Sequence, residues 1–105
     1  MPSSQVTRIT DIGHGTCHLH NPPVFYTTTF YQGDPVVFAD ELNVMRIGDL
    51  GHASCGHDTI ALTGSAVSFG SNGQGLHRIG DIGHIIGSQE STYTVITGSH
   101  NVDSE

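Results

Sequence analysis

Short runs of apolar, β-branched and aromatic residues, each bounded by turn residues, recur along the chain and predict strands. Residues 24–31 form such a run directly after two prolines, and residues 92–97 alternate between polar and apolar positions as a half-buried strand does. A shorter apolar run covers residues 36–39. Asn72 and Gly73 separate two further runs, and this dipeptide is typical of a type I′ turn between two strands. The pattern therefore predicts an all-β fold built from short hairpins.

Two markers repeat in phase along the chain. The first reads RITDIGH, RIGDLGH or RIGDIGH, and it starts at Arg8, Arg46 and Arg78. The second is a glycine followed by Asp or Ser and a short strand pattern, and it starts at Gly33, Gly64 and Gly98. Repeat periods of about 20–50 residues indicate a repeat architecture. We therefore expect residues 1–105 to form one domain of three pseudo-threefold repeats.

Each copy of the first marker holds an arginine and, three residues later, an aspartate. The three pairs are Arg8 with Asp11, Arg46 with Asp49, and Arg78 with Asp81. Asp can accept hydrogen bonds from nearby backbone N–H groups, and a glycine beside it supplies the positive φ that many tight turns require. We expect each pair to act as a structural clamp across a turn.

The charge balance excludes some classes of partner. The chain has ten acidic residues, three arginines and no lysine, for a net charge of −7. Nucleic-acid binding is not expected, because neutralising phosphates needs clustered Lys and Arg. The first ten residues lack the basic and apolar regions of a signal peptide. We therefore expect the chain to be made in a cytoplasm. Disulfides are rare there, so Cys17 and Cys55 are expected to be thiols or metal ligands.

Three of the eight histidines end the first marker and suggest a metal site. If the repeats form equivalent corners, His14, His52 and His84 converge on a common axis. A closed structural zinc site takes four nitrogen or sulfur ligands in a tetrahedron. Cys17 and Cys55 each follow one of these histidines in an H-x-x-C unit, and spacing alone leaves both open as the fourth ligand. The remaining histidines are expected on the surface or behind the ligands: His18, His20, His57, His77 and His100.

Two other kinds of metal site use similar residues. Three histidines and a water are the pattern of a zinc hydrolase or hydratase. A blue-copper site needs a distant axial methionine, for which Met45 is the candidate besides the initiator. Either cysteine thiol could take the coordination position that a catalytic water would need. Three short repeats also offer little material for a substrate pocket. We therefore expect a structural ion, no catalytic residues and no enzyme.

These residues resemble the PAAR family, the zinc-bearing tip proteins of contractile tail spikes. Residues 33–46 match the family repeat in length and pattern, and residues 64–78 match it with one extra residue. Of the Pro-Ala-Ala-Arg tetrapeptide that gives the family its name, only the arginine is present here, as Arg46 and Arg78. The family's second repeat usually supplies two ligands separated by two residues, which here selects His52 and Cys55.

The resemblance implies a sharp cone of β-hairpins around one structural Zn²⁺ near its vertex, with iron the less favoured metal. The ligand set is then His14, His52, Cys55 and His84, and the vertex is formed by the corners that carry these histidines. The base is expected to include the strand at residues 24–31, whose aromatic side chains need cover.

The function implied is mechanical. The chain would cap a homotrimeric β-helical central spike, with one tip per trimer, and contact the target cell envelope transiently while helping to pierce it. The short tail after Val102 favours a phage baseplate in the virion tail, made in the host cytoplasm, over a type VI secretion tip, which often carries an effector extension.

Overall fold

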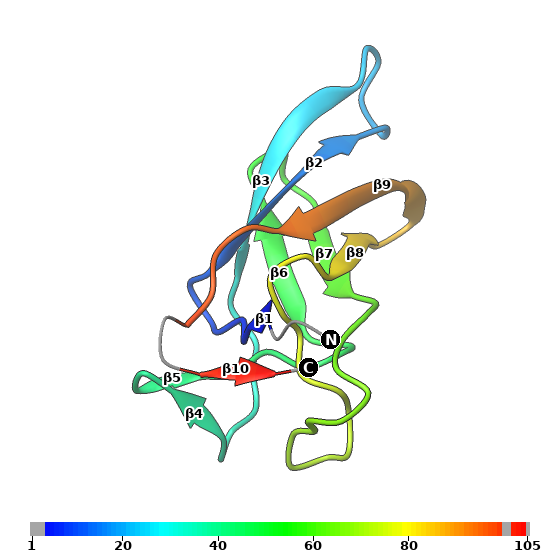
Figure 1. Cartoon of the computed structure of the whole chain (residues 1–105). Helices are drawn as coiled ribbons and strands as arrows, with labels where there is room; N and C mark the ends of the chain where they lie inside the picture. The colour runs from blue at the N-terminus through cyan, green and yellow to red at the C-terminus, as the bar shows by residue number, and fades with distance from the viewer. Residues whose placement is uncertain (1–3, 100–101, 105) are drawn as a thin grey trace.

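A closed antiparallel barrel dominates the computed structural model, which describes residues 4–99 and 102–104 (Figure 1). The strands pair around the barrel in the order β2, β3, β6, β7, β8, β9 and back to β2. Their bounds are Ile12–Cys17, Val24–Phe30, Leu50–Ala53, Asp58–Ala61, Ile82–Ile85 and Ser88–Val95. The barrel therefore consists of three hairpins, one from each sequence repeat.

Two small sheets lie below the barrel. Strands β4 (Phe38–Ala39) and β5 (Leu42–Asn43) form one, and β1 (Ser4–Gln5) pairs with β10 (Asp103–Ser104) to form the other. The described residues contain no helix, so the predicted all-β fold is confirmed. A helix long and apolar enough to cross a membrane is accordingly absent from the described part of the chain.

Backbone hydrogen bonds join the three repeats in a closed ring. The Thr7 N–H donates to the His77 carbonyl at 2.8 Å, His77 donates to Met45 at 2.9 Å, and Met45 donates back to Thr7 at 2.8 Å. A second ring runs beside it, in which Ile9 donates to Asn43, Ile47 to Gly75 and Ile79 to Gln5, each at 2.9 Å. Equivalent positions of the repeats therefore surround one pseudo-threefold axis.

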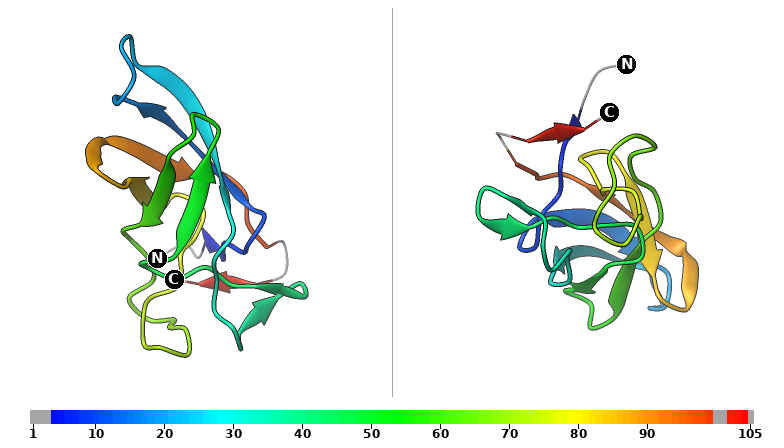
Figure 2. Two further views of the ribbon diagram at one scale, coloured as in Figure 1. Left: turned by 180° about the vertical axis from the view of Figure 1, so that it is seen from behind. Right: turned by 90° about the horizontal axis from the view of Figure 1, so that it is seen from below.

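The two ends of this axis are the base and the apex. The base comprises the three corners that hold the Arg–Asp pairs, together with the β4–β5 hairpin, the loop at residues 66–75 and the β1–β10 pair. The hairpin, the loop and the β1–β10 pair surround the centre when the molecule is seen from below (Figure 2). The apex comprises the three barrel turns at residues 18–23, 54–57 and 86–87, of which the first reaches farthest from the base (Figure 1).

The Arg–Asp clamps form at all three corners, as predicted. The Arg46 backbone N–H and Nε both donate to Asp49 Oδ2 at 2.8 Å, while NH2 donates to Oδ1 at 2.9 Å. The pairs Arg8–Asp11 and Arg78–Asp81 repeat this bidentate pattern. Each arginine also donates a hydrogen bond of 3.4 Å to the backbone carbonyl of a glycine. Arg8 donates to Gly98, Arg46 to Gly33 and Arg78 to Gly64. The clamps thus fix the second marker to the first.

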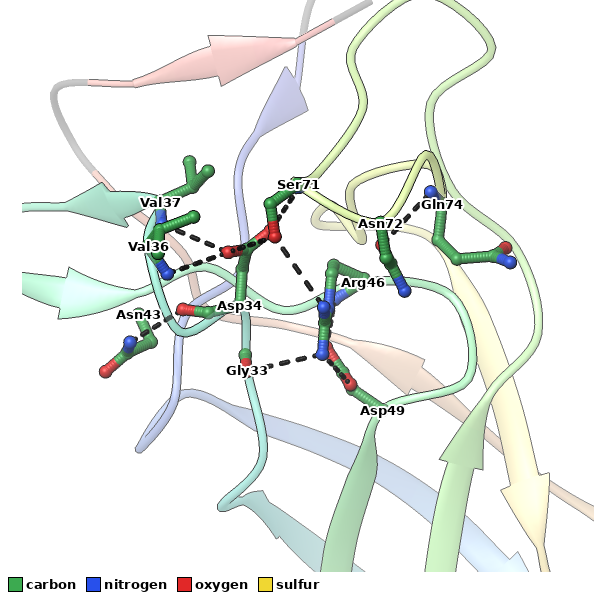
Figure 3. A network of polar contacts seen from close by, with 10 residues as sticks. All are labelled: Gly33, Asp34, Val36, Val37, Asn43, Arg46, Asp49, Ser71, Asn72 and Gln74. Atoms are coloured by element: carbon green, nitrogen blue, oxygen red, sulfur yellow. Dashed lines mark hydrogen bonds and ion pairs between the residues drawn. The ribbon is translucent and has the colours of Figure 1, made fainter.

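A buried aspartate joins two neighbouring corners of the base (Figure 3). Asp34 Oδ1 accepts from the backbone of Val36 and Val37 and from Ser71 Oγ, and Asp34 Oδ2 accepts from the Ser71 N–H. Burial raises the pKa of Asp34, but these hydrogen bonds outweigh it and hold the pKa below its usual value. Asp34 is therefore ionised at neutral pH and pins one repeat to the next.

Large side chains fill the barrel and a smaller cluster fills the base. The barrel core is built around Tyr26, Phe30, Ile85 and Tyr93, with Met45 at the level of the hydrogen-bonded rings. The base has a separate buried cluster of Val6, Ala39, Val44 and Leu76. Strand β3 belongs to the barrel and starts at the apex, so the expectation that residues 24–31 form the base is corrected.

The turn at Asn72 and Gly73 differs from the predicted type I′ turn. Gly73 has a positive φ of 81° but Asn72 does not, and the Gly73 N–H donates to the Gly70 carbonyl while Gly70 donates to Gln74. This is a three-residue loop with a left-handed glycine at its end, since Phe69 pairs with Gly75. The two-residue geometry occurs instead at Asp40 and Glu41, whose φ values are 52° and 69°.

Candidate metal centre

Three side chains at the apex form a group that could hold a metal ion. Cys17 ends β2, His20 lies in the β2–β3 turn, and His57 lies in the β6–β7 turn. Their ligand atoms all lie within 4.8 Å of one another. A buried thiol and two imidazoles that converge in this way are suited to a transition metal.

Local geometry explains why these residues meet. Side chains alternate between the two faces of a strand, and Cys17 lies on the inward face of β2, where it is fully buried. The β6–β7 turn closes by hydrogen bonds from Ala53 to His57 and from Gly56 to Ala53, with Gly56 at a φ of 96°. The pairing of β3 with β6 then brings this turn beside the β2–β3 turn.

An unpartnered nitrogen supports the assignment. The Nε2 atom of His20 is buried and has no hydrogen-bond partner within the described structure. Its ring lies 5.4 Å from that of His57, measured between centroids. A buried polar atom without a partner is destabilising, and a bound cation at this point would satisfy it.

A second thiol lies next to this group. Cys55, in the β6–β7 turn, is half-buried against the barrel core and interacts with the Cys17 thiol. Burial and the neighbouring Cys17 thiol raise the pKa of Cys55. A metal ion would reverse this effect, because coordination deprotonates a thiol. Cys55 lies outside the convergent group of three but adjoins it through its contact with Cys17.

The three marker histidines are not brought together. None of His14, His52 and His84 belongs to the convergent group. The His14 ring packs edge-on against Phe25 at 5.1 Å, His52 Nδ1 is 2.9 Å from Asp58 Oδ1, and His84 Nδ1 is 2.6 Å from the Ile85 carbonyl oxygen. We therefore move the candidate site from these three histidines to Cys17, His20 and His57, and keep Cys55 as its neighbour.

The glycine before each marker histidine gives the physical reason. Gly13, Gly51 and Gly83 are buried on the inner face, so the histidine that follows each of them faces out. A Cβ atom at Gly13 would lie 2.7 Å from the Tyr93 ring, and one at Gly83 would lie 2.3 Å from the Ile60 carbonyl oxygen. The barrel requires glycine at these positions, and the repeated Gly-His pair reflects that packing.

The sequence contained a signal for the convergent group. Cys17 and His20 form a C-x-x-H unit, and Cys55 and His57 form a C-x-H unit. Cys17 ends β2, and the other three residues lie in turns. The two histidines, His20 and His57, fall outside the repeated marker, so reasoning from repeat symmetry passed over them. The remaining histidines separate clearly, since His18 is exposed, His77 is fully buried, and His100 lies outside the described residues.

No protein-family model matches the chain, and no curated protein matches its sequence.

Proposed function

We propose that this chain is the metal-stabilised tip that caps the trimeric central spike of a contractile injection machine and helps pierce the target envelope. A phage baseplate is the preferred setting, with a type VI secretion tip as the alternative. The PAAR-like repeats, the pseudo-threefold base and the Cys/His group at the opposite end support this assignment. The metal proposed is one structural zinc ion, held by Cys17, His20 and His57 with Cys55 as the fourth ligand.

The observation that carries the proposal is the closed hydrogen-bond ring of Thr7, Met45 and His77. A ring of this kind gives one chain three equivalent sides, so a single copy can match the end of a threefold-symmetric trimer. Homotrimers with closed symmetry present such an end along their axis. One tip per trimer is the stoichiometry that this match favours.

Exposed apolar side chains lie at equivalent positions of two base corners. Val36 and Phe38 in the first corner correspond to Val67 and Phe69 in the second, and all four are more than half exposed. Contiguous exposed apolar surface marks sites of protein association. We assign these residues to the contact with the spike.

A metal centre suits the opposite end of the molecule for a mechanical reason. Narrow turns leave little interior for a hydrophobic core, and a structural zinc site contributes on the order of 10 kcal/mol to folding. Cys17 and His20 come from one hairpin and His57 from another, so an ion there ties two turns together. A three-histidine hydrolase finds no support in this geometry, because its histidines lie on the outer face of the barrel.

Native mass spectrometry tests the proposal directly. The chain is mixed with its cognate trimeric spike protein, and we expect a complex of one tip per trimer. Phe38→Ser and Phe69→Ser should each weaken the complex, while Phe25→Ser, at the other end of the molecule, should leave it unchanged. Three tips per trimer, or no binding to the spike, would refute the proposed function.

A further inference from the structure

The β2–β3 hairpin differs from the rest of the chain in charge. Residues 12–33, which span both strands and their turn, contain no Asp, Glu, Lys or Arg. All ten acidic residues and all three arginines of the chain lie outside this hairpin. A hairpin without formal charge can enter an apolar medium without the large penalty that attends a buried ion.

The outer end of this hairpin exposes apolar side chains. Leu19 is 48% exposed, Val24 is 38% exposed and Phe25 is 65% exposed. Pro22 and Pro23, between them, are also exposed. Their clustering at one turn distinguishes them from singly scattered surface residues.

The position and backbone pairing of the β2–β3 hairpin favour a lipid surface as its partner. It projects beyond the other two barrel turns (Figure 1). Its two strands pair with each other as far as Cys17 and Val24, and the turn beyond them contains two prolines, which have no N–H to be solvated. A fluid lipid surface accommodates a projecting apolar end of this kind.

We propose that the end of the β2–β3 hairpin is a contact site for a zwitterionic lipid bilayer. Leu19 and Phe25 enter the boundary between headgroups and acyl chains, where amphipathic and aromatic side chains are stabilised. This inference rests on the proposed function, which turns this end of the molecule toward the envelope. The net charge of −7 disfavours anionic lipid, so the uncharged hairpin is directed to neutral headgroups.

A single tryptophan probe tests this contact. The chain has no tryptophan, so Phe25→Trp introduces one indole at the apex and Phe38→Trp, at a residue 55% exposed in the wild type, introduces one at the base. With phosphatidylcholine vesicles, we expect a blue shift of the emission from the Phe25→Trp variant and none from the Phe38→Trp variant. An unchanged Phe25→Trp spectrum, or equal shifts in both variants, would overturn the inference.

Vesicle flotation of the otherwise unaltered protein provides a second measurement. Phe25→Ser should reduce the fraction that floats with phosphatidylcholine vesicles roughly tenfold, the scale set by the transfer of one large apolar side chain. Phe38→Ser should float as the wild type does. Binding only to vesicles that contain anionic lipid would contradict the choice of neutral headgroups.

The two proposals fail separately. If flotation fails while one chain still binds per spike trimer, the lipid contact is wrong and the proposed function stands. If flotation succeeds and the trimer does not bind, the proposed function is wrong. Melting temperatures of Phe25→Ser and Phe38→Ser serve as folding controls, because both residues are exposed.

Discussion

The two ends of this molecule are stabilised by different chemistry, although the same three repeats build both. At the base, Arg–Asp clamps and rings of backbone hydrogen bonds recur at equivalent positions. At the apex the repeats diverge, because the Cys17 position of the first repeat corresponds to Cys55 in the second and Gly87 in the third. The base therefore has the symmetry that a trimeric partner requires, whereas the apex has one asymmetric Cys/His group.

The contrast shows where repeat symmetry constrains side chains. Around the pseudo-threefold axis, Thr7, Met45 and His77 occupy one equivalent position and all are fully buried, yet their chemistry differs. The backbone hydrogen bonds hold the ring regardless of side chain, so each side chain adapts to its own neighbours in the barrel. Four perturbations separate the contributions of apex and base to stability.

Metal removal should have the largest effect and should act at the apex. We expect one zinc per chain by elemental analysis, and Cys17→Ser or His57→Ala should release most of it. Chelation should lower the melting temperature by more than roughly 10 °C, since structural zinc contributes on the order of 10 kcal/mol. His84→Ala is the matched control and should keep the metal. Zinc lost from His84→Ala but retained by His57→Ala would return the site to the marker histidines.

Breaking a clamp should have the next largest effect and should act at the base. Arg46→Met leaves the buried Asp49 carboxylate without its counter-charge, and we expect a loss of about 3 kcal/mol in unfolding free energy. The exposed His52–Asp58 pair on the barrel wall provides the comparison, because His52→Ala should cost less than about 1 kcal/mol. Urea unfolding measures both variants. Equal losses would show that burial does not distinguish the two pairs.

Acid should weaken the junction between base and barrel. His77 Nδ1 lies 2.6 Å from the Thr63 carbonyl oxygen, which can only accept, so Nδ1 carries the proton and Nε2 accepts from the Tyr93 hydroxyl at 2.9 Å. Burial lowers the pKa of His77. The unfolded chain therefore takes up the proton first, and stability should fall as the pH drops below about 6.5, by at most about 1.4 kcal/mol per pH unit.

This pH dependence is measured by urea unfolding at pH 7, 6 and 5, with chelator present throughout so that metal release does not contribute. His77→Gln should be less stable at pH 7 but should lose this decline. If the stability of His77→Gln falls by the same amount between pH 7 and pH 5, groups other than His77 cause the pH dependence. The carboxylates Asp34 and Asp81, whose pKa values are lowered, should act only at more acidic pH.

The smallest effect concerns one corner of the base. Thr10 has a φ of 75°, where the other two corners have Gly48 at 92° and Gly80 at 91°. Positive φ is unfavourable for a β-branched residue, so Thr10→Gly should raise the unfolding free energy by about 1 kcal/mol. Gly48→Thr should lower it by at least as much, since no atom crowds that position and the backbone alone opposes the change. An unchanged unfolding free energy for Thr10→Gly would mean that this corner tolerates threonine at a positive φ.

The strands at residues 24–31 and 92–97 were predictable because their alternation and residue types are local properties, and β3 and β9 cover most of both ranges. The geometry of the turns was less predictable from the sequence. Asn72 and Gly73 occur in a three-residue loop, while Asp40 and Glu41 adopt the two-residue form, because the lengths of the paired segments fix the loop.

The sequence by itself determined the repeats, the all-β fold and the clamps. Each clamp joins residues three positions apart, so its partners meet whenever the turn forms. Only the tertiary structure decided which histidines converge. His14, His52 and His84 share a place in the repeat, but the inward glycine beside each one directs it outward. Cys17 and His20 meet His57 because β3 pairs with β6, a contact between distant segments that no local pattern specifies.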